Sequence, residues 1–590
     1  MTRILLCFTF TLLILVFLSV AWASTDNITS AGTRIEISGV SAEIKTNIEL
    51  HLGVNKELIP NSTLGFPRSA EYIRAKAKLA LQALGYYRPT ISLSRTQQQN
   101  DQKQNEWTLT IELNQATQWH QIDLQLQGPG SDYQPLIQIV KKHPFTKGLT
   151  VNHGTYEQYK NQLLQRAIES GFLDAQFEIS RMDINVSKSI ADVKWLLKTG
   201  ARYYLGKVEL SGSSLSQAFL RKYLFVQPKE IYQYENIIKS QQALNRSGYF
   251  NLVTIDQTVN RETYLVDITI ALQDIEKYEF KTTLGYGTDT GGKIGVSWLD
   301  RQVNDRGHNY LLSIDSSKIE TITAFQYKIP LDNQKSAWLN RVSYRIKDDN
   351  LARSKISAYE SRLINQINEH WSSQWALALA TENITTDSSI ISNLNYLIPS
   401  WQTNYYSVTD PFSAQTGWRW MSEIHFGAKQ LSEPDIEFFQ IEQNIKSIWA
   451  LSEDWRLLFR GRAGFTKMNI EHFNTSMPTD FRYFAGGDVS VRGYDYQSLA
   501  PKDIDSLILG GKHLLTSSLE LDWQFSSNWR WAVFTDQGNA FNDWQDIDIH
   551  RSVGTGLRWI TPVGSVRLDL AKALDGQEDL SWHITIGPDL

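Results

Sequence analysis

The sequence contains almost no cysteine, since Cys7 is the only one among 590 residues. It lies in an apolar run that follows Met1-Thr2-Arg3 and closes with Ala21-Trp22-Ala23. A basic start, a short apolar segment and a small-x-small ending are typical of a secretory signal peptide, so we expect cleavage after Ala23. A mature chain starting at Ser24 would have no thiol, which excludes disulfides and cysteine chemistry.

After residue 23 the sequence also has no long hydrophobic run, because no stretch approaches the roughly 20 apolar residues that a membrane-spanning helix requires. Phe, Trp and Tyr nevertheless make up 12% of the chain, with 19 tryptophans and 25 tyrosines. Only helices and closed barrels cross a bilayer, since every backbone polar group must find a partner there. The chain is therefore either a large soluble periplasmic protein or an outer-membrane β-barrel. Its net charge of −5 is too mild to indicate a nucleic-acid partner.

Motifs of enzyme chemistry are lacking as well. The 11 histidines are scattered, and none occurs in an H-E-x-x-H or comparable metal-binding spacing. The glycines of Gly285-Tyr286-Gly287 open no helix, so a hairpin turn is a better interpretation of them than a phosphate-binding loop. We therefore expect no catalytic residue, no metal and no cofactor, and a protein that is not an enzyme.

The first half of the chain repeats. Three glycines about 80 to 90 residues apart each end a short alternating strand, and three more follow helical stretches and precede an aromatic residue. The first set is Gly39, Gly128 and Gly212, and the second is Gly85, Gly171 and Gly248. Each unit is predicted to run strand, helix, helix, strand, strand, with the second glycine closing a helix. We expect three α+β domains, at residues 24–118, 119–200 and 201–275.

From about residue 276 the sequence alternates between apolar and polar residues. An example is Leu519, Leu521 and Trp523, which alternate with Glu520 and Asp522. A soluble sandwich also alternates, but here aromatic residues lie at strand ends and charges on the opposite face, as in membrane barrels. At roughly 20 residues for each strand and loop, residues 276–590 predict an all-β transmembrane barrel of about sixteen antiparallel strands.

One long loop interrupts the alternation and contains Val491-Arg492-Gly493-Tyr494. Loops of this length are uncommon and usually functional or disordered. Two strands later comes Phe534-Thr535-Asp536-Gln537-Gly538. If Trp531 and Val533 face lipid, the alternation directs Phe534 and Asp536 toward the lumen.

These features together resemble the outer-membrane barrel assembly-factor superfamily, whose members carry periplasmic POTRA domains (polypeptide-transport-associated repeats). The repeats resemble POTRA domains, Val491-Arg492-Gly493-Tyr494 resembles the tip of the family's sixth extracellular loop, and Phe534, Asp536 and Gly538 match its F-x-D-x-G strand motif. The resemblance implies that Arg492 reaches into the barrel and pairs with Asp536, with Tyr494 and Phe534 packing beside them. A guanidinium suits this role because its planar fork binds a carboxylate through two bonds.

Within the superfamily, the number of repeats discriminates. General barrel-assembly subunits usually have more than three, and two-partner secretion transporters have fewer. The ending Gly587-Pro588-Asp589-Leu590 also resembles that of the outer-membrane subunit of the translocation and assembly module. This resemblance implies a TamB-like inner-membrane partner that docks on the first POTRA domain. It also implies outer-membrane protein clients such as autotransporters, and a location in the outer membrane of a Gram-negative bacterium. A role in moving phospholipid to the outer membrane is a further expectation.

The first and last predicted strands must close the barrel along one lateral seam. The seam residues are Phe280, Gly285 and Gly287 in the first strand and Trp582 and Gly587 in the last. A weakly paired seam could open sideways and template client strands by edge pairing. Lumenal charges fit a passive pore equally well, so a pore or a two-partner-secretion-type transporter remains an alternative at this point.

Overall fold

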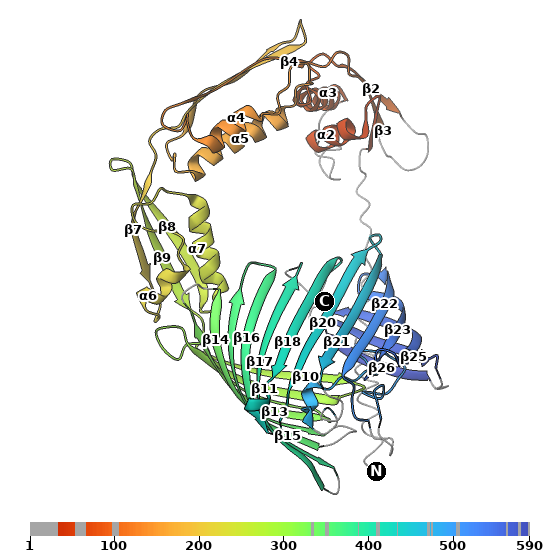
Figure 1. Cartoon of the computed structure of the whole chain (residues 1–590). Coiled ribbons are helices and arrows are strands. Elements are labelled where there is room, and N and C mark those ends of the chain that lie inside the picture. The colour runs from red at the N-terminus through yellow and green to blue at the C-terminus, as the bar shows by residue number, and fades with distance from the viewer. Residues whose placement is uncertain are drawn as a thin grey trace, which may run out of the picture. The chain divides into compact units, whose positions relative to one another are not determined.

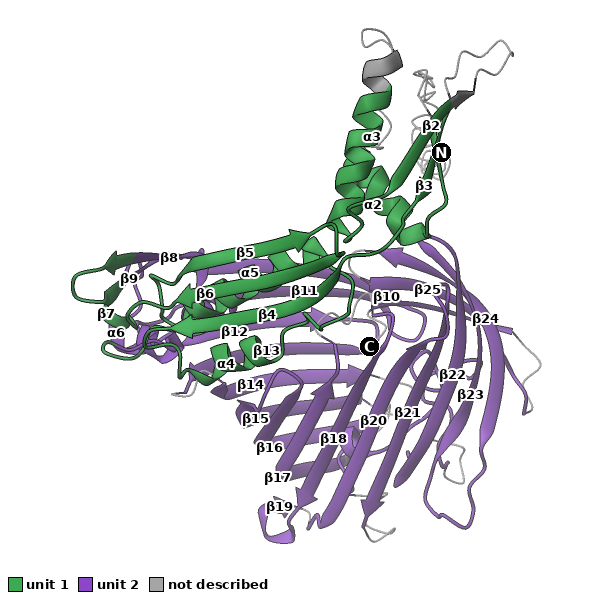
Figure 2. Ribbon diagram, turned by 90° about the horizontal axis from the view of Figure 1, so that it is seen from above, with its two compact units in different colours: residues 1–207, 228–235, 258–267 green, residues 208–227, 236–257, 268–590 purple. Residues whose placement is uncertain are grey.

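The computed structural model describes residues 34–52, 66–96, 106–331, 335–348, 353–386, 389–408, 414–433, 435–468, 473, 476–502, 508–561, 564–575 and 580–587 (Figure 1). The expected signal peptide and residues 588–590 lie outside this described part. The chain divides into two compact units (Figure 2). The first contains residues 1–207, 228–235 and 258–267, and the second contains residues 208–227, 236–257 and 268–590. The division therefore passes through the third predicted repeat.

Each of the three repeats places two helical segments against a three-stranded sheet. The first consists of β1 (Arg34–Ser38), α2 (Ala42–Leu52), α3 (Phe66–Ala83), β2 (Thr90–Thr96) and β3 (Glu106–Glu112), with sheet order β1-β3-β2. The second consists of β4 (Gln118–Gln127), α4 (Gln134–Lys141), α5 (His153–Glu169), β5 (Gln176–Asn185) and β6 (Ile190–Lys198), with order β4-β6-β5. The third consists of β7 (Tyr204–Ser211), α6 (Gln217–Leu220), η1 (Arg221–Tyr223), α7 (Tyr234–Arg246), β8 (Phe250–Asn260) and β9 (Leu265–Asp274), with order β7-β9-β8.

The repeated glycines have a steric cause. The strand glycine Gly39 has a φ of +87°, and a Cβ there would lie 2.3 Å from the carbonyl oxygen of Ile111 in β3. Gly212 meets the carbonyl oxygen of Leu272 in β9 in the same way, at 2.2 Å. Only glycine combines this left-handed backbone with so close an approach to a neighbouring strand. The glycine spacing that identified the repeats thus marks the same close approach of the chain to a neighbouring strand in the first and third repeats.

The third repeat contacts a turn of the barrel within the second unit. Tyr249 donates its hydroxyl to the carbonyl of Gly307, and the Ser216 amide donates to the Asp305 carbonyl at 2.9 Å. A Cβ on Gly307 would lie 2.4 Å from the ring of Phe219. This turn joins the second and third strands of the barrel.

The second half forms one antiparallel sheet whose neighbours follow chain order. Its strands are β10 (Tyr278–Gly287), β11 (Gly291–Asp300), β12 (Asn309–Ser316), β13 (Glu320–Pro330), β14 (Ser336–Asp348), β15 (Arg353–Gln366), β16 (Trp371–Thr386), β17 (Ser389–Tyr406), β18 (Gly417–Gly427), β19 (Ser432–Glu433), β20 (Phe438–Ala450), β21 (Trp455–Lys467), β22 (His513–Ser526), β23 (Trp529–Phe541), β24 (His550–Thr561), β25 (Gly564–Ala573) and β26 (Leu580–Gly587). Short 3-10 turns occur at η2 (Lys429–Leu431) and η3 (Thr479–Phe481). The two-residue β19 adds to the edge of β17, so sixteen strands form the nearly closed barrel in the described part of the chain. This confirms the predicted order of α+β repeats and barrel.

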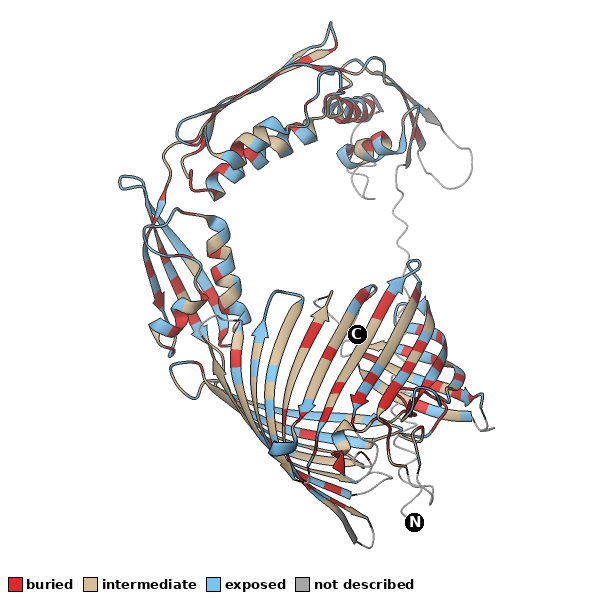
Figure 3. Ribbon diagram, in the orientation of Figure 1, coloured by how far each residue is buried: buried red, intermediate tan, exposed pale blue. Residues whose placement is uncertain are grey.

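Burial alternates along the barrel strands, where exposed residues are interspersed with buried ones (Figure 3). In β23, Trp531 and Val533 are exposed, whereas Phe534 and Asp536 are buried. The outward apolar residues are those that a lipid environment would cover. Among the described helices, none combines the length and apolarity needed to cross a membrane.

Candidate functional site

The described residues between β21 and β22 fold back inside the barrel. We call these residues, 468, 473, 476–502 and 508–512, the inner loop. Two isolated bridges, Tyr483 with Gly511 and Ala485 with Leu499, give it a hairpin-like form. Its apolar side chains share a core with the barrel strands, and the buried members are Tyr483, Ala485, Val491, Tyr494, Leu499, Leu514, Ala540 and Ala573. The inner loop is therefore held by packing as well as by polar contacts.

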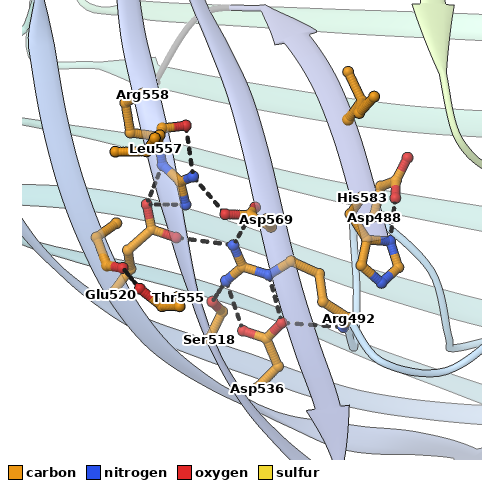
Figure 4. Close-up of polar contacts among 12 residues, drawn as sticks. Asp488, Arg492, Ser518, Glu520, Asp536, Thr555, Leu557, Arg558, Asp569 and His583 are labelled. Carbon is orange, nitrogen blue, oxygen red and sulfur yellow. Dashed lines mark hydrogen bonds and ion pairs between the residues drawn. The ribbon is translucent and has the colours of Figure 1, made fainter. Parts of the chain in front are cut away.

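Arg492 of the inner loop pairs with Asp536 of β23. Its Nε donates to Asp536 Oδ2 at 2.7 Å and its Nη2 donates to Oδ1 at 2.9 Å (Figure 4). The backbone amide of Arg492 adds a third hydrogen bond to Oδ2 at 3.1 Å. Arg492 is 4% exposed and Asp536 is 0% exposed. The fork of two charge-assisted bonds fixes the side chain in one orientation. We call this pair the loop lock.

A wider charged network surrounds the loop lock. Arg492 Nη1 also donates to Glu520 Oε2 and to Asp569 Oδ2, each at 2.9 Å, and Nη2 donates to the Ser518 hydroxyl at 3.2 Å. Arg558 of β24 donates to the same two carboxylates. A buried charge is costly unless it is paired and hydrogen-bonded, and each of these groups meets opposite charge. The sequence did not predict the pairing of Glu520 with Arg558, although both occupy inward-facing positions in strands with an alternating apolar and polar pattern.

The other motif residues are brought close to the loop lock in different ways. The guanidinium carbon of Arg492 lies 3.3 Å from the ring centre of Phe534, a cation–π contact. Tyr494 lies against β24 instead, with its hydroxyl donating to the Arg551 carbonyl at 3.1 Å. The ring of Tyr494 also lies against His550 at the start of the same strand, with the ring centres 5.4 Å apart. Gly538 allows a close approach of strands, since a Cβ there would lie 2.4 Å from the Leu515 carbonyl oxygen.

Gly493 has a φ of +91°, which side chains rarely adopt. A Cβ there would lie 3.1 Å from the Ala573 amide nitrogen and 3.2 Å from the Lys572 carbonyl carbon. The inner loop thus passes directly against the backbone of β25 at this point. A larger residue would displace the loop from the strand.

The first and last strands do not form a continuous backbone ladder. Among the described residues, β10 pairs only with β11 and β26 pairs only with β25. Phe280 and Leu284 of β10 are 71% and 77% exposed, and seven of the ten residues of this strand are exposed. Contact occurs at the hairpin end of β10, where the Ile584 amide of β26 donates to the Thr288 hydroxyl at 3.1 Å. The described seam is therefore bare along much of β10.

The remaining seam residues lie on these two strands. Gly285 and Gly287 are half-buried in β10, and a Cβ on Gly287 would lie 3.9 Å from the Ile584 carbonyl oxygen. Trp582 projects outward from β26 and is exposed, and Gly587 is the last described residue of that strand. The structure thus places all five predicted seam residues at the two free edges of the sheet.

One group of side chains at the seam has donors of the kind that bind metals. Ligand atoms of Asp289, Asp488 and His583 all lie within 4.8 Å of one another. However, His583 Nδ1 is hydrogen-bonded to Asp488 Oδ1, and His583 Nε2 accepts from the Gly493 amide at 2.9 Å. A cation could bind this imidazole only by breaking one of these bonds. We therefore assign no metal to the group.

Comparison with family models gives three matches. The model of the Omp85 superfamily domain matches residues 276–589. The model "POTRA domain TamA domain 1" matches residues 34–115, and the POTRA model described as a surface antigen variable number repeat matches residues 203–273. The barrel match alone covers more than half of the chain.

Two known proteins illustrate the likeness. The outer membrane protein assembly factor BamA of Nitratidesulfovibrio vulgaris is 22% identical over 429 residues, which is 68% of this chain and 53% of BamA. The chain thus spans about half the length of this curated relative. The crystal structure of Haemophilus ducreyi BamA lacking POTRA domains 1–3 has a TM-score of 0.67 at 17% identity, covering 80% of this chain and 99% of that one. At this level of identity the structural likeness shows a shared fold.

Proposed function

The chain belongs to the Omp85 superfamily, as an outer-membrane β-barrel with periplasmic POTRA domains, and from this premise we propose that it is an assembly factor of the TamA type. In this proposal it inserts or translocates outer-membrane proteins such as autotransporters, together with a TamB-like partner anchored in the inner membrane. It acts by binding and guiding client strands, without catalysing a covalent reaction.

The bare edge of β10 is the observation that carries the proposal. A strand edge presents unpaired N–H and C=O groups, which can pair with an incoming strand at little cost. Because β10 directly follows the periplasmic repeats, its first residues lie on the periplasmic side, where clients arrive. The missing ladder to β26 leaves this edge available among the described residues. A client strand would therefore add to β10 first and widen the seam as it does so.

The loop lock supplies a fixed frame for this opening. Arg492 joins the inner loop to β22, β23 and β25 through Glu520, Asp536 and Asp569. These strands would keep their register while β10 and β26 separate. The loop lock therefore orders the inner loop on the β26 side of the seam.

Two observations support the TamA type in particular. The model that matches residues 34–115 describes the first POTRA domain of TamA. The structure also contains three repeats of POTRA topology before the barrel, as the sequence predicts. A TamB-like partner would dock on the first of them. The three-stranded sheet of this repeat has two edge strands, β1 and β2, to which a partner strand could add.

A disulfide across the seam tests the proposal. Gly287→Cys and Ile584→Cys would be combined, since the backbones of these residues approach each other and the expected mature chain has no other thiol. Leu519→Cys with Thr535→Cys, which are register partners in β22 and β23, provides the control. Surface display of an autotransporter passenger would be measured in cells under oxidising and reducing conditions.

We expect display to fall only in the oxidised seam variant and to recover on reduction. Equal display in the oxidised and reduced seam variant would exclude lateral opening as the mechanism. Loss of display in the control pair as well would show that rigidity of the barrel in general, not the seam, is what matters.

A further inference from the structure

The inner loop touches both edges of the seam through one carboxylate. Asp488 accepts hydrogen bonds from the Thr288 hydroxyl, at 3.0 Å to Oδ1 and 3.1 Å to Oδ2. Its Oδ1 is also hydrogen-bonded to Nδ1 of His583 in β26 (Figure 4). Thr288 follows the last residue of β10, so a single side chain of the loop bridges the first and last strands. We call Thr288, Asp488 and His583 the seam latch.

The hydrogen-bond directions in the seam latch are determined by its neighbours. The Gly493 amide donates to His583 Nε2, so this nitrogen carries a lone pair. Nδ1 must then carry the ring proton of the neutral imidazole and donate it to Asp488. Thr288 accepts from the Ile584 amide and therefore has its hydroxyl proton free for Asp488. Every polar group of the latch is thus used in one consistent pattern.

The same imidazole connects the latch to the loop lock. Gly493, which donates to His583, directly follows Arg492 in the chain. Two of the three latch side chains are shielded from water, since Asp488 is 8% exposed and His583 is 4% exposed, whereas Thr288 is exposed. Charge-assisted hydrogen bonds are strongest in such surroundings. A shift of the inner loop would therefore change two hydrogen bonds of the His583 ring in β26, one to Asp488 and one from Gly493.

We propose that the inner loop, rather than strand pairing, holds the outer end of the seam closed, with Asp488 and His583 as the positioning residues. Opening then requires Asp488 to release β10 or His583 to release the loop. This inference deepens the proposed function, because it assigns the element that regulates lateral opening. It is tested without a client, so its failure would leave the assembly role standing.

Spin-label distances across the seam provide the test. Leu284→Cys in β10 and Ile586→Cys in β26 are both exposed and would carry the labels in the full-length protein in lipid nanodiscs. Asp488→Ala removes the bridge, and Asp495→Ala is the matched control, since Asp495 is an exposed aspartate of the same loop. We expect Asp488→Ala to raise the population of long distances about tenfold, because a buried charge-assisted bond is lost, and Asp495→Ala to leave it unchanged. Identical distributions in Asp488→Ala and the parent would overturn the proposal.

Two conservative variants of His583 separate its two bonds. An asparagine amide can place a donor where Nδ1 lies, and so keep the bond to Asp488. A glutamine can instead place an acceptor near Nε2, and so keep the bond from Gly493. We expect His583→Asn to retain the closed seam and His583→Gln to open it like Asp488→Ala. Equal open populations in the two variants would contradict the assigned roles, and circular dichroism would show that each barrel is folded.

Discussion

Arg492 and Arg558 share the carboxylates of Glu520 and Asp569, one guanidinium approaching from the inner loop and the other from β24. Two like charges come this close only because acidic groups lie between them, and Asp536 adds a third carboxylate on the loop side. The loop is thus held by a network that the barrel completes, and removing either arginine takes a hydrogen-bonded partner from both shared carboxylates.

Removing Arg492 should release the inner loop. Arg492→Ala leaves Asp536 buried without its partner, a change that typically costs about 3–5 kcal/mol. Arg492→Lys keeps the charge but loses the fork, so we expect an intermediate loss. Limited proteolysis of intact cells at the loop, together with urea unfolding in detergent, would measure both effects. An Arg492→Ala barrel as resistant as the parent would mean that apolar packing alone holds the loop.

Replacing both members of the loop lock should cost less than the single changes suggest. Arg492→Met with Asp536→Leu removes the buried charge from both sides, and contacting residues usually couple by about 0.5 to 3 kcal/mol. A double-mutant cycle on the free energy of unfolding measures this coupling. If the two single changes in the free energy of unfolding simply add, Arg492 stabilises the loop through Glu520 and Asp569 and not through Asp536.

Asp289, in the hairpin after β10, should make the contact between hairpin and loop depend on pH. Burial, aided by the charge of Asp488, raises the pKa of Asp289 to about 6. A raised carboxyl pKa means that the stability it contributes is complete below the ordinary pKa near 4 and is lost as pH rises through about 6. Asp289→Asn can still accept from the Asp488 amide, now at 2.7 Å from Oδ2, without carrying the charge.

We therefore expect Asp289→Asn to be more stable than the parent at pH 7.5 and equal to it near pH 4. Thermal unfolding of both proteins across this range gives the comparison, and other titrating groups cancel because both proteins contain them. A stability difference that does not change with pH would show that the Asp289 charge is not responsible.

Tyr87 and His153 should couple the first and second repeats in a pH-dependent way. The Tyr87 hydroxyl is hydrogen-bonded to His153 Nε2. Burial raises the pKa of Tyr87 to about 12 and lowers the pKa of His153, so the pair consists of a phenol and a neutral imidazole. Stability from a lowered histidine pKa is present above about 6.5 and lost as pH falls through the folded-state value.

Hydrogen exchange in residues 84–87 and 151–156 of the full chain would follow this contact. Protection, corrected for intrinsic rates, should weaken in the parent between pH 7.5 and pH 5. In His153→Gln the protection should already be weaker than in the parent at pH 7.5, and it should change little between pH 7.5 and pH 5. Protection in the parent that stays constant down to pH 5 would refute the coupling.

The sequence predicts what depends on local spacing. Period-two alternation directs Asp536 inward, and the glycine spacing locates three repeats, because both patterns are set by backbone geometry within one segment. Glu520 and Arg558 were missed as partners, since their meeting depends on the register between β22 and β24, to which no local pattern points. Asp488 and His583 were missed for the same reason, because they lie on a loop and a strand that only barrel closure brings together.

The turn between β11 and β12 has a mechanical consequence. The third repeat contacts this turn through Tyr249, Phe219 and Ser216. Arg301, at the start of the turn, forms an ion pair with Glu279 near the first residue of β10. These contacts therefore join part of the third repeat to the first strand through this one turn. A force that a partner or client applies to the repeat would be transmitted through this turn to the periplasmic end of β10. The described edge of β10 is unpaired there, so the strand can move.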